Sequence, residues 1–126
     1  MTAETETGSI GKELFWTRLD EILHSSEVII DRPQGKAHPD HPAMVYPLDY
    51  GYLAGTSSPD GREIDVWLGS LPEKKLDAVI CTVDLLKKDA EIKLILGCTE
   101  REKSIVCRFL NGGGYLAGIL IRRDPE

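Results

Sequence analysis

The stretch YPLDYGYLAGTSSPDGREIDVWL, residues 46–68, contains two predicted strands and the turn that joins them. Aromatic residues and glycines alternate over residues 46–56, which predicts a half-buried strand in close contact with another backbone. Polar and apolar residues alternate over residues 63–68, which predicts a second strand with its odd-numbered residues on one face. Between the two, Pro59-Asp60-Gly61 is typical of a turn.

Two amphipathic helices are predicted outside this stretch. The first covers residues 10–24 with Ser9 as its N-cap, and its apolar stripe consists of Phe15, Leu19, Ile22 and Leu23. The second follows Thr99-Glu100-Arg101-Glu102, which fits a capping box, and ends at the glycines of residues 112–114.

The remaining segments predict strands and their connections. Further strands are expected at residues 27–31, 78–86, 92–96 and 115–121, with a polar hairpin tip at residues 87–91 and a proline-rich loop at residues 33–47. The order of helix, strands, helix and strand predicts an α+β fold with a mainly antiparallel sheet or a small barrel.

Length and composition limit the class of protein. The chain has 126 residues, which fits one domain, expected at residues 9–126 behind a polar tail at residues 1–8. A net charge of −6 argues against partners such as nucleic acid or an anionic membrane. Three cysteines without C-x-x-C spacing predict neither disulfides nor a zinc ribbon. Because no apolar run is long enough to span a membrane, a cytoplasmic protein is expected.

Four carboxylates are candidate metal ligands. The turn at Asp60 lets its side chain point back over the strand that carries Asp65, so both can bind one Mg²⁺. Asp89 and Glu91 lie in the predicted hairpin tip, and if the fold brings this tip beside Asp60 and Asp65, the four carboxylates would repel one another unless metal ions neutralise them. The alternative is that Asp60 caps a turn and that the other three are solvated surface residues.

Basic residues are candidate contacts for phosphate. Arg32 ends a predicted strand, Lys36 follows it, and Lys93 shares a strand face with Glu91. Each is otherwise a surface residue, so the prediction depends on their convergence. The His38-Pro39-Asp40-His41 sequence would suit a zinc pair only with further ligands, and a surface loop is the favoured interpretation.

Taken together, three segments resemble the soluble, Mg²⁺-dependent inorganic pyrophosphatases, a barrel-forming family. They are Ile30-Asp31-Arg32, Tyr46-Pro47-Leu48-Asp49-Tyr50-Gly51-Tyr52 and Asp60-Gly61-Arg62-Glu63-Ile64-Asp65-Val66, with a weaker match over residues 87–96. The resemblance covers just over half of the chain and implies a small OB-like β-barrel, here with flanking N-terminal and C-terminal helices.

The resemblance also implies roles for individual residues. Asp60 and Asp65 would hold Mg²⁺, with Asp89 and Glu91 as a second acidic cluster. Arg32 and Lys93 would contact phosphate, and Tyr50 would lie beside the substrate. The reaction would be hydrolysis of pyrophosphate, or of a similar small phosphate compound, to phosphate.

One difference from the family opens a second hypothesis. Arg62 lies where the family has a carboxylate that helps to activate water, and Glu63 is the candidate catalytic replacement. The alternative is a non-catalytic phosphate-binding, nucleotide-binding or interaction module on the same barrel. An exposed Phe15 or Trp16 on the first helix would favour a homo-oligomer.

Overall fold

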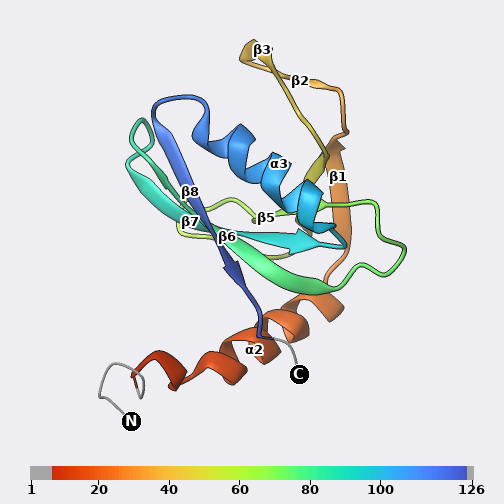
Figure 1. Cartoon of the computed structure of the whole chain (residues 1–126), viewed down its shortest axis with the longest axis vertical. Helices are drawn as coiled ribbons and strands as arrows, with labels where there is room; N and C mark the ends of the chain where they lie inside the picture. Colours follow the sequence, from red (N-terminus) through yellow and green to blue (C-terminus); the bar gives the residue numbers. More distant parts are fainter. Residues whose placement is uncertain (1–6, 125–126) are drawn as a thin grey trace.

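The computed structural model describes residues 7–124 and has an α+β fold (Figure 1). The helices are α2 (Lys12–His24) and α3 (Glu100–Asn111). The strands are β1 (Val28–Arg32), β2 (Ala37–His38), β3 (His41–Val45), β4 (Asp49–Leu53), β5 (Ile64–Leu68), β6 (Leu76–Asp84), β7 (Asp89–Leu96) and β8 (Leu116–Arg122).

Six strands form one mixed sheet in the order β1-β4-β5-β7-β6-β8. All neighbouring pairs are antiparallel except β5 and β7, which run parallel. The predicted, mainly antiparallel α+β architecture is therefore confirmed. The sheet is open, with β1 at one edge and β8 at the other.

Each face of the sheet packs against one helix. Val106 and Leu110 of α3 pack with Trp67 on one face, whereas Trp16 of α2 packs with Val66 on the other. Adjacent residues of β5 thus enter different cores, as the alternation over residues 63–68 predicts. It follows that Asp65, two residues before Trp67, lies on the α3 face.

The contacting face of α2 agrees with the predicted stripe at Leu19 and Leu23 but not at Phe15 and Ile22, which are exposed. The helix begins at Lys12, and its N-cap is Gly11, not Ser9. Of the two candidate aromatic residues, Phe15 is exposed at 40% and Trp16 is buried at 4%. Trp16 packs with Val66 in the apolar core beneath the sheet, and the guanidinium carbon of Arg123 lies 5.7 Å from its ring centroid.

Two connections also differ from expectation. The predicted loop at residues 33–47 contains the β2–β3 hairpin. The β6–β7 turn covers residues 85–88, because the Asp84 carboxylate accepts hydrogen bonds from the backbone N–H groups of Leu86 and Lys87 at 2.9 and 3.0 Å. Asp89 and Glu91 therefore belong to strand β7 and not to the hairpin tip.

The ends of α3, the packing at Gly51 and the N-terminal tail complete the comparison with the predicted elements. Thr99 and Glu102 form the predicted capping box, and α3 ends before Gly112. A side chain at Gly51 would overlap the carbonyl oxygen of Ile29, which confirms the close backbone approach. Of the expected tail, residues 1–6 lie outside the described part, and residues 7–8 are helical. Within residues 7–124, no helix is long and apolar enough to cross a membrane.

Candidate functional site

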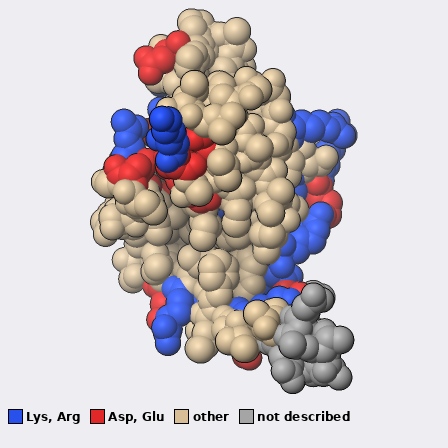
Figure 2. Space-filling model, turned by 90° about the vertical axis from the view of Figure 1, so that its left-hand side faces the viewer, with Lys and Arg blue, Asp and Glu red and all other residues tan. Residues whose placement is uncertain are grey.

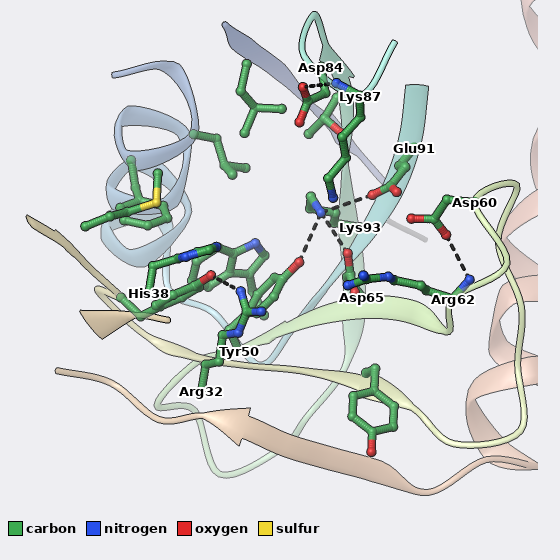
Figure 3. A pocket seen from close by; sticks show the side chains of 18 of the residues that line it. Arg32, His38, Tyr50, Asp60, Arg62, Asp65, Asp84, Lys87, Glu91 and Lys93 are labelled. Carbon is green, nitrogen blue, oxygen red and sulfur yellow. Dashed lines mark hydrogen bonds and ion pairs between the residues drawn. The ribbon is translucent and has the colours of Figure 1, made fainter. Parts of the chain in front are cut away.

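A cavity of about 480 Å³ lies on the α3 face of the sheet, between the β2–β3 hairpin, the β6–β7 hairpin and the C-terminal end of α3 (Figure 3). Eight Asp or Glu side chains line it, against four Lys or Arg side chains, which are Arg32, Arg62, Lys87 and Lys93. Figure 2 shows Lys and Arg side chains beside Asp and Glu at the upper left of one face of the molecule. The excess of negative charge in the cavity disfavours a phosphate ligand unless cations accompany it.

Three carboxylates form an acidic triad, Asp60, Asp89 and Glu91, whose nearest oxygens all lie within 4.8 Å of one another. Asp60 is exposed on the turn, where Gly61 has a φ of 82°, and the other two are on one face of β7 because they are two residues apart. A turn and a strand thus bring the triad together.

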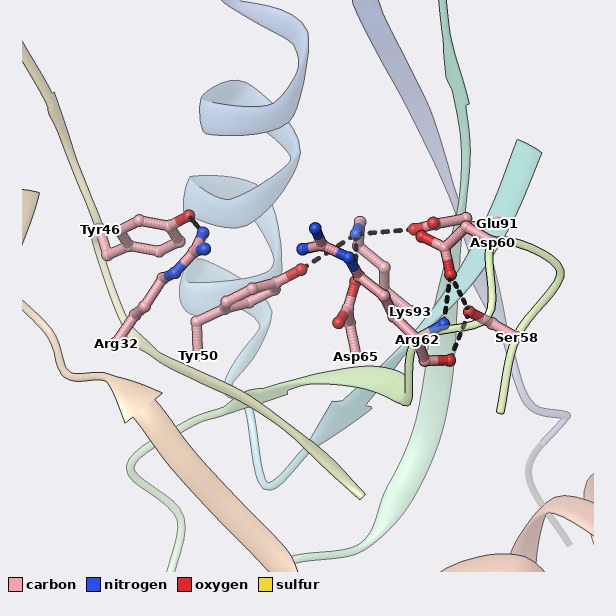
Figure 4. Close-up of polar contacts among 9 residues, drawn as sticks. All are labelled: Arg32, Tyr46, Tyr50, Ser58, Asp60, Arg62, Asp65, Glu91 and Lys93. Carbon is pink, nitrogen blue, oxygen red and sulfur yellow. Dashed lines mark hydrogen bonds and ion pairs between the residues drawn. The ribbon is translucent and has the colours of Figure 1, made fainter. Parts of the chain in front are cut away.

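Hydrogen bonds stabilise the charged form of Asp60. Its Oδ1 accepts from the Arg62 backbone N–H at 2.9 Å and from the Ser58 hydroxyl at 2.8 Å, and these bonds lower the pKa of Asp60 to about 2 (Figure 4). Glu91 differs, since burial and a hydrogen bond with Asp60 raise its pKa. Asp60, Asp89 and Glu91 lie close enough to repel one another, and a cation among them would neutralise that repulsion.

Lys93 is the buried cation of the site. Its Nζ donates to Asp65 Oδ2 at 2.8 Å, to the Tyr50 hydroxyl at 3.0 Å and to Glu91 Oε2 at 3.3 Å (Figure 3). Burial opposes the charge of Lys93, but Tyr50 and Asp65 raise its pKa above the ordinary value. Burial also raises the pKa of Tyr50, so this residue is a neutral hydrogen-bonding phenol beside a charged ammonium group.

The predicted carboxylates divide into two groups. Asp65 is paired with Lys93, whereas Asp60 lies with Asp89 and Glu91 in the acidic triad. Lys93 contacts both groups, because it also bonds Glu91. A single cation shared by Asp60 and Asp65 stays a prediction.

Aromatic rings hold Arg32 on the β1 side of the cavity. Its guanidinium donates to the Tyr46 hydroxyl, and its central carbon lies 5.4 Å from the Tyr46 ring centroid and 6.0 Å from that of Tyr50. Burial opposes the guanidinium charge, but the hydrogen bond to Tyr46 helps to raise its pKa. Lys36 is exposed and does not line the cavity, while the half-buried Glu63 does.

Two cations of the cavity were not predicted as ligand contacts. Figures 3 and 4 show the Arg62 side chain crossing above Asp65 toward Tyr50, and Figure 3 shows Lys87 extending from the β6–β7 turn toward Lys93. Arg62 lies between Asp60 and Asp65 in the sequence, so its closeness to these candidate ligands could be predicted. Lys87 carries no such signal, because its direction depends on the turn that Asp84 sets.

The two histidines lie at the β2–β3 side of the cavity. Their ring centroids are 4.9 Å apart, and Nδ1 of His38 accepts a hydrogen bond from the Asp40 backbone N–H at 3.0 Å. Burial and the nearby Arg32 lower the pKa of His38. Among residues 7–124, the only cluster of three or more potential metal ligands is the acidic triad. The histidine pair therefore has no third ligand beside it in this part of the chain.

A second, apolar groove of about 630 Å³ lies mainly on the opposite face of the sheet. Its lining includes Val83, Ile92 and Ile119, which are 55%, 39% and 62% exposed. The groove offers apolar area with few polar groups, so it adds no chemistry to the cavity.

Comparison with known protein families gave no match to this chain, and comparison with curated proteins gave none either. The cavity offers oxygen ligands for a hard divalent cation and Lys and Arg groups for phosphate, all within one enclosure.

Proposed function

We propose that this protein hydrolyses inorganic pyrophosphate or a related phosphoanhydride in a Mg²⁺-dependent reaction. The observation that carries the proposal is that the acidic triad and four Lys or Arg side chains line the same cavity. A site with carboxylates alone would repel phosphate. A site that bound phosphate through Lys and Arg alone would have no use for the three clustered carboxylates. A metal-bound, multiply charged phosphate compound satisfies both sets of charges.

The triad fits Mg²⁺ by its chemistry. Mg²⁺ prefers oxygen ligands at about 2.0–2.1 Å and commonly keeps several waters while it bridges carboxylates and phosphate. Oxygens of Asp60, Asp89 and Glu91 lie within 4.8 Å of one another, so one cation can bind all three carboxylates. Asp60, Asp89 and Glu91 would hold the ion, with Asp65 as a further ligand once it leaves Lys93. When bound, the ion supplies charge neutralisation and an acidified water.

The chain's own side chains have separate tasks in this proposal. Arg32, Arg62 and Lys87 bind phosphate oxygens from three directions, and Arg32 is oriented by its hydrogen bond to Tyr46. Lys93 orients the Tyr50 hydroxyl, and it holds Asp65 until that carboxylate binds the ion. Glu63 lines the cavity, and we assign it as the carboxylate that accepts a proton from the attacking water.

The OB-like barrel belongs to the same proposal. Five consecutive neighbours in the sheet, β1-β4-β5-β7-β6, match the number of strands in that partly open architecture. The sixth strand, β8, extends the sheet beyond them.

Phosphate release from pyrophosphate tests the proposal. Wild-type protein should release phosphate with Mg²⁺ and stop when the metal is chelated. Asp60→Asn should need at least about tenfold more Mg²⁺, because one charged ligand is lost. Asp65→Asn should lower the rate, whereas the exposed Glu21→Gln on α2 should match wild type. No phosphate release by wild type, or equal rates in wild type and Asp65→Asn, would reject hydrolysis at this site.

One observation favours a second candidate function. The side chain that crosses the middle of the cavity is the cationic Arg62, at the position where the resemblance places a carboxylate (Figure 4). A non-catalytic module that binds phosphate or nucleotide needs that cation and no base. Calorimetric binding of pyrophosphate with Mg²⁺, without phosphate release, would support this candidate over hydrolysis.

A further inference from the structure

The cavity is larger than its phosphate-binding groups require. Its volume of about 480 Å³ falls in the range of about 300–1,000 Å³ that holds organic ligands. Pyrophosphate consists of two phosphorus and seven oxygen atoms, so it would leave much of this space unfilled. The rest of the cavity therefore has room for a group attached to the diphosphate.

One end of the cavity has an apolar wall. It is built from the C-terminal end of α3, the start of β8 and the β6–β7 turn, and it consists of Leu86, Phe109, Leu110, Tyr115 and Leu116. Phe109 and Leu116 are only partly buried, and their inner sides pack against the core. Leu86 is 71% exposed. Uncovered apolar and aromatic area at this end favours an organic group over a phosphate.

Beside this wall lie two largely buried polar residues, Thr82 and Asp84, with oxygen atoms that no group in the described part of the chain binds. Thr82 is 3% exposed and Asp84 is 9% exposed, and both share a strand face with Ile80 of the α3-side core. The hydroxyl of Thr82 makes no hydrogen bond within residues 7–124, and the bonds to Asp84 reach Oδ1 and leave Oδ2 unused. Both oxygens keep accessible surface in the cavity, so they can accept hydrogen bonds from a ligand that donates them.

The two ends of the cavity are connected by Lys87. Its backbone N–H bonds Asp84, while its side chain extends toward Lys93 and the acidic triad (Figure 3). A ligand with a flat, hydrogen-bond-donating organic group at one end and a diphosphate at the other would match this order.

We propose that the substrate of this site is a nucleoside diphosphate, whose base packs against Phe109 and Leu86 and whose N–H or hydroxyl groups donate to Asp84 and Thr82. This inference rests on the proposed phosphoanhydride hydrolysis. The oxygen of water forms a bond to the terminal phosphorus, and the bond from that phosphorus to the bridging oxygen breaks. The products are a nucleoside monophosphate and inorganic phosphate, and the proton of the water passes to Glu63 and then to solvent.

The test compares ADP with pyrophosphate as substrates in the presence of Mg²⁺. Wild-type protein should have a KM for ADP at least tenfold below that for pyrophosphate. Phe109→Ala and Leu86→Ser should each raise the KM for ADP more than that for pyrophosphate, by about tenfold for Phe109→Ala. Leu85→Ser is the matched control, since Leu85 is 67% exposed, adjoins Leu86 and does not line the cavity.

The outcomes separate this inference from the proposed function. Hydrolysis of pyrophosphate alone, or variants at Leu86 and Phe109 that change both substrates equally, would overturn the nucleotide proposal and leave phosphoanhydride hydrolysis standing. Hydrolysis of neither compound would reject the proposed function. Calorimetry with the same two compounds then decides on the ligand: tighter binding of ADP, weakened by Phe109→Ala, supports the nucleotide site, and equal affinities overturn it.

Discussion

Replacing Lys93 by methionine tests the electrostatic centre of the cavity. The change keeps most of the side-chain volume but leaves Asp65 and Glu91 without their cation, at a position that is 7% exposed. Removing one partner of a buried ion pair costs about 3–5 kcal/mol. The Asp65 side chain is 27% exposed, so water partly compensates its charge after Lys93 is removed. Hence we expect Lys93→Met to lower the free energy of unfolding by about 3 kcal/mol, the lower end of that range.

Thermal unfolding measures this loss. Unfolding entropy of about 2.1 cal/mol/K per residue gives a fall in Tm of about 11 °C for a chain of 126 residues. Lys75→Met is the control, because its side chain is 71% exposed and its contact to Glu73 is 3.7 Å, and we expect a change below about 0.5 kcal/mol.

A double-mutant cycle identifies the interaction responsible. Asp65→Asn removes the closest partner of Lys93, at 2.8 Å, so the double variant should be more stable than the sum of the single changes by about 1 kcal/mol or more. A Lys93→Met protein whose unfolding free energy lies within 0.5 kcal/mol of wild type, or additive single changes, would refute the role assigned to this pair.

Three further predictions concern the framework around the cavity. Gly51→Ala should destabilise the protein by about 3 kcal/mol or more in urea unfolding, because β1 blocks the added methyl group, whereas Gly113→Ala should cost less than about 0.5 kcal/mol. Burial would raise the pKa of Glu102, but hydrogen bonds, among them the one from the Thr99 N–H, lower it below its ordinary value. The ionised Glu102 therefore stabilises the fold above pH 4.5, and this stabilisation is lost as the pH falls further. Urea unfolding at pH 7 and pH 3.5 should therefore show a smaller pH dependence in Glu102→Gln than in wild type, and equal slopes would contradict it. Burial raises the pKa of Cys98 to about 12, so iodoacetamide at pH 8 should alkylate it only after unfolding, and mass spectrometry of native protein should find it unmodified.

Short-range patterns predicted the parts of the fold that depend on neighbouring residues. The capping box at Thr99 and Glu102 formed as expected, because its two hydrogen bonds lie within one helical turn. Alternation in β5 placed Asp65 on the same face as Trp67 for the same reason, since side chains of a strand alternate whatever surrounds it. The turn at Asp60 is likewise local, because hydrogen bonds from Ser58 and Arg62 to Asp60 and the positive φ of Gly61 form it.

Contacts between distant segments decided the rest. The sequence suggested that Asp89 and Glu91 lie on a hairpin tip, but Asp84 shortens the turn and places both in β7, where they meet Asp60 from a different loop. Nothing local shows that Lys93 will bond Tyr50, which is 43 residues away. Residue types and their spacing thus determined which side chains were available for chemistry. Sheet pairing determined which of them share an enclosure, because the direction of a side chain depends on the strand beside it as well as on its own residue.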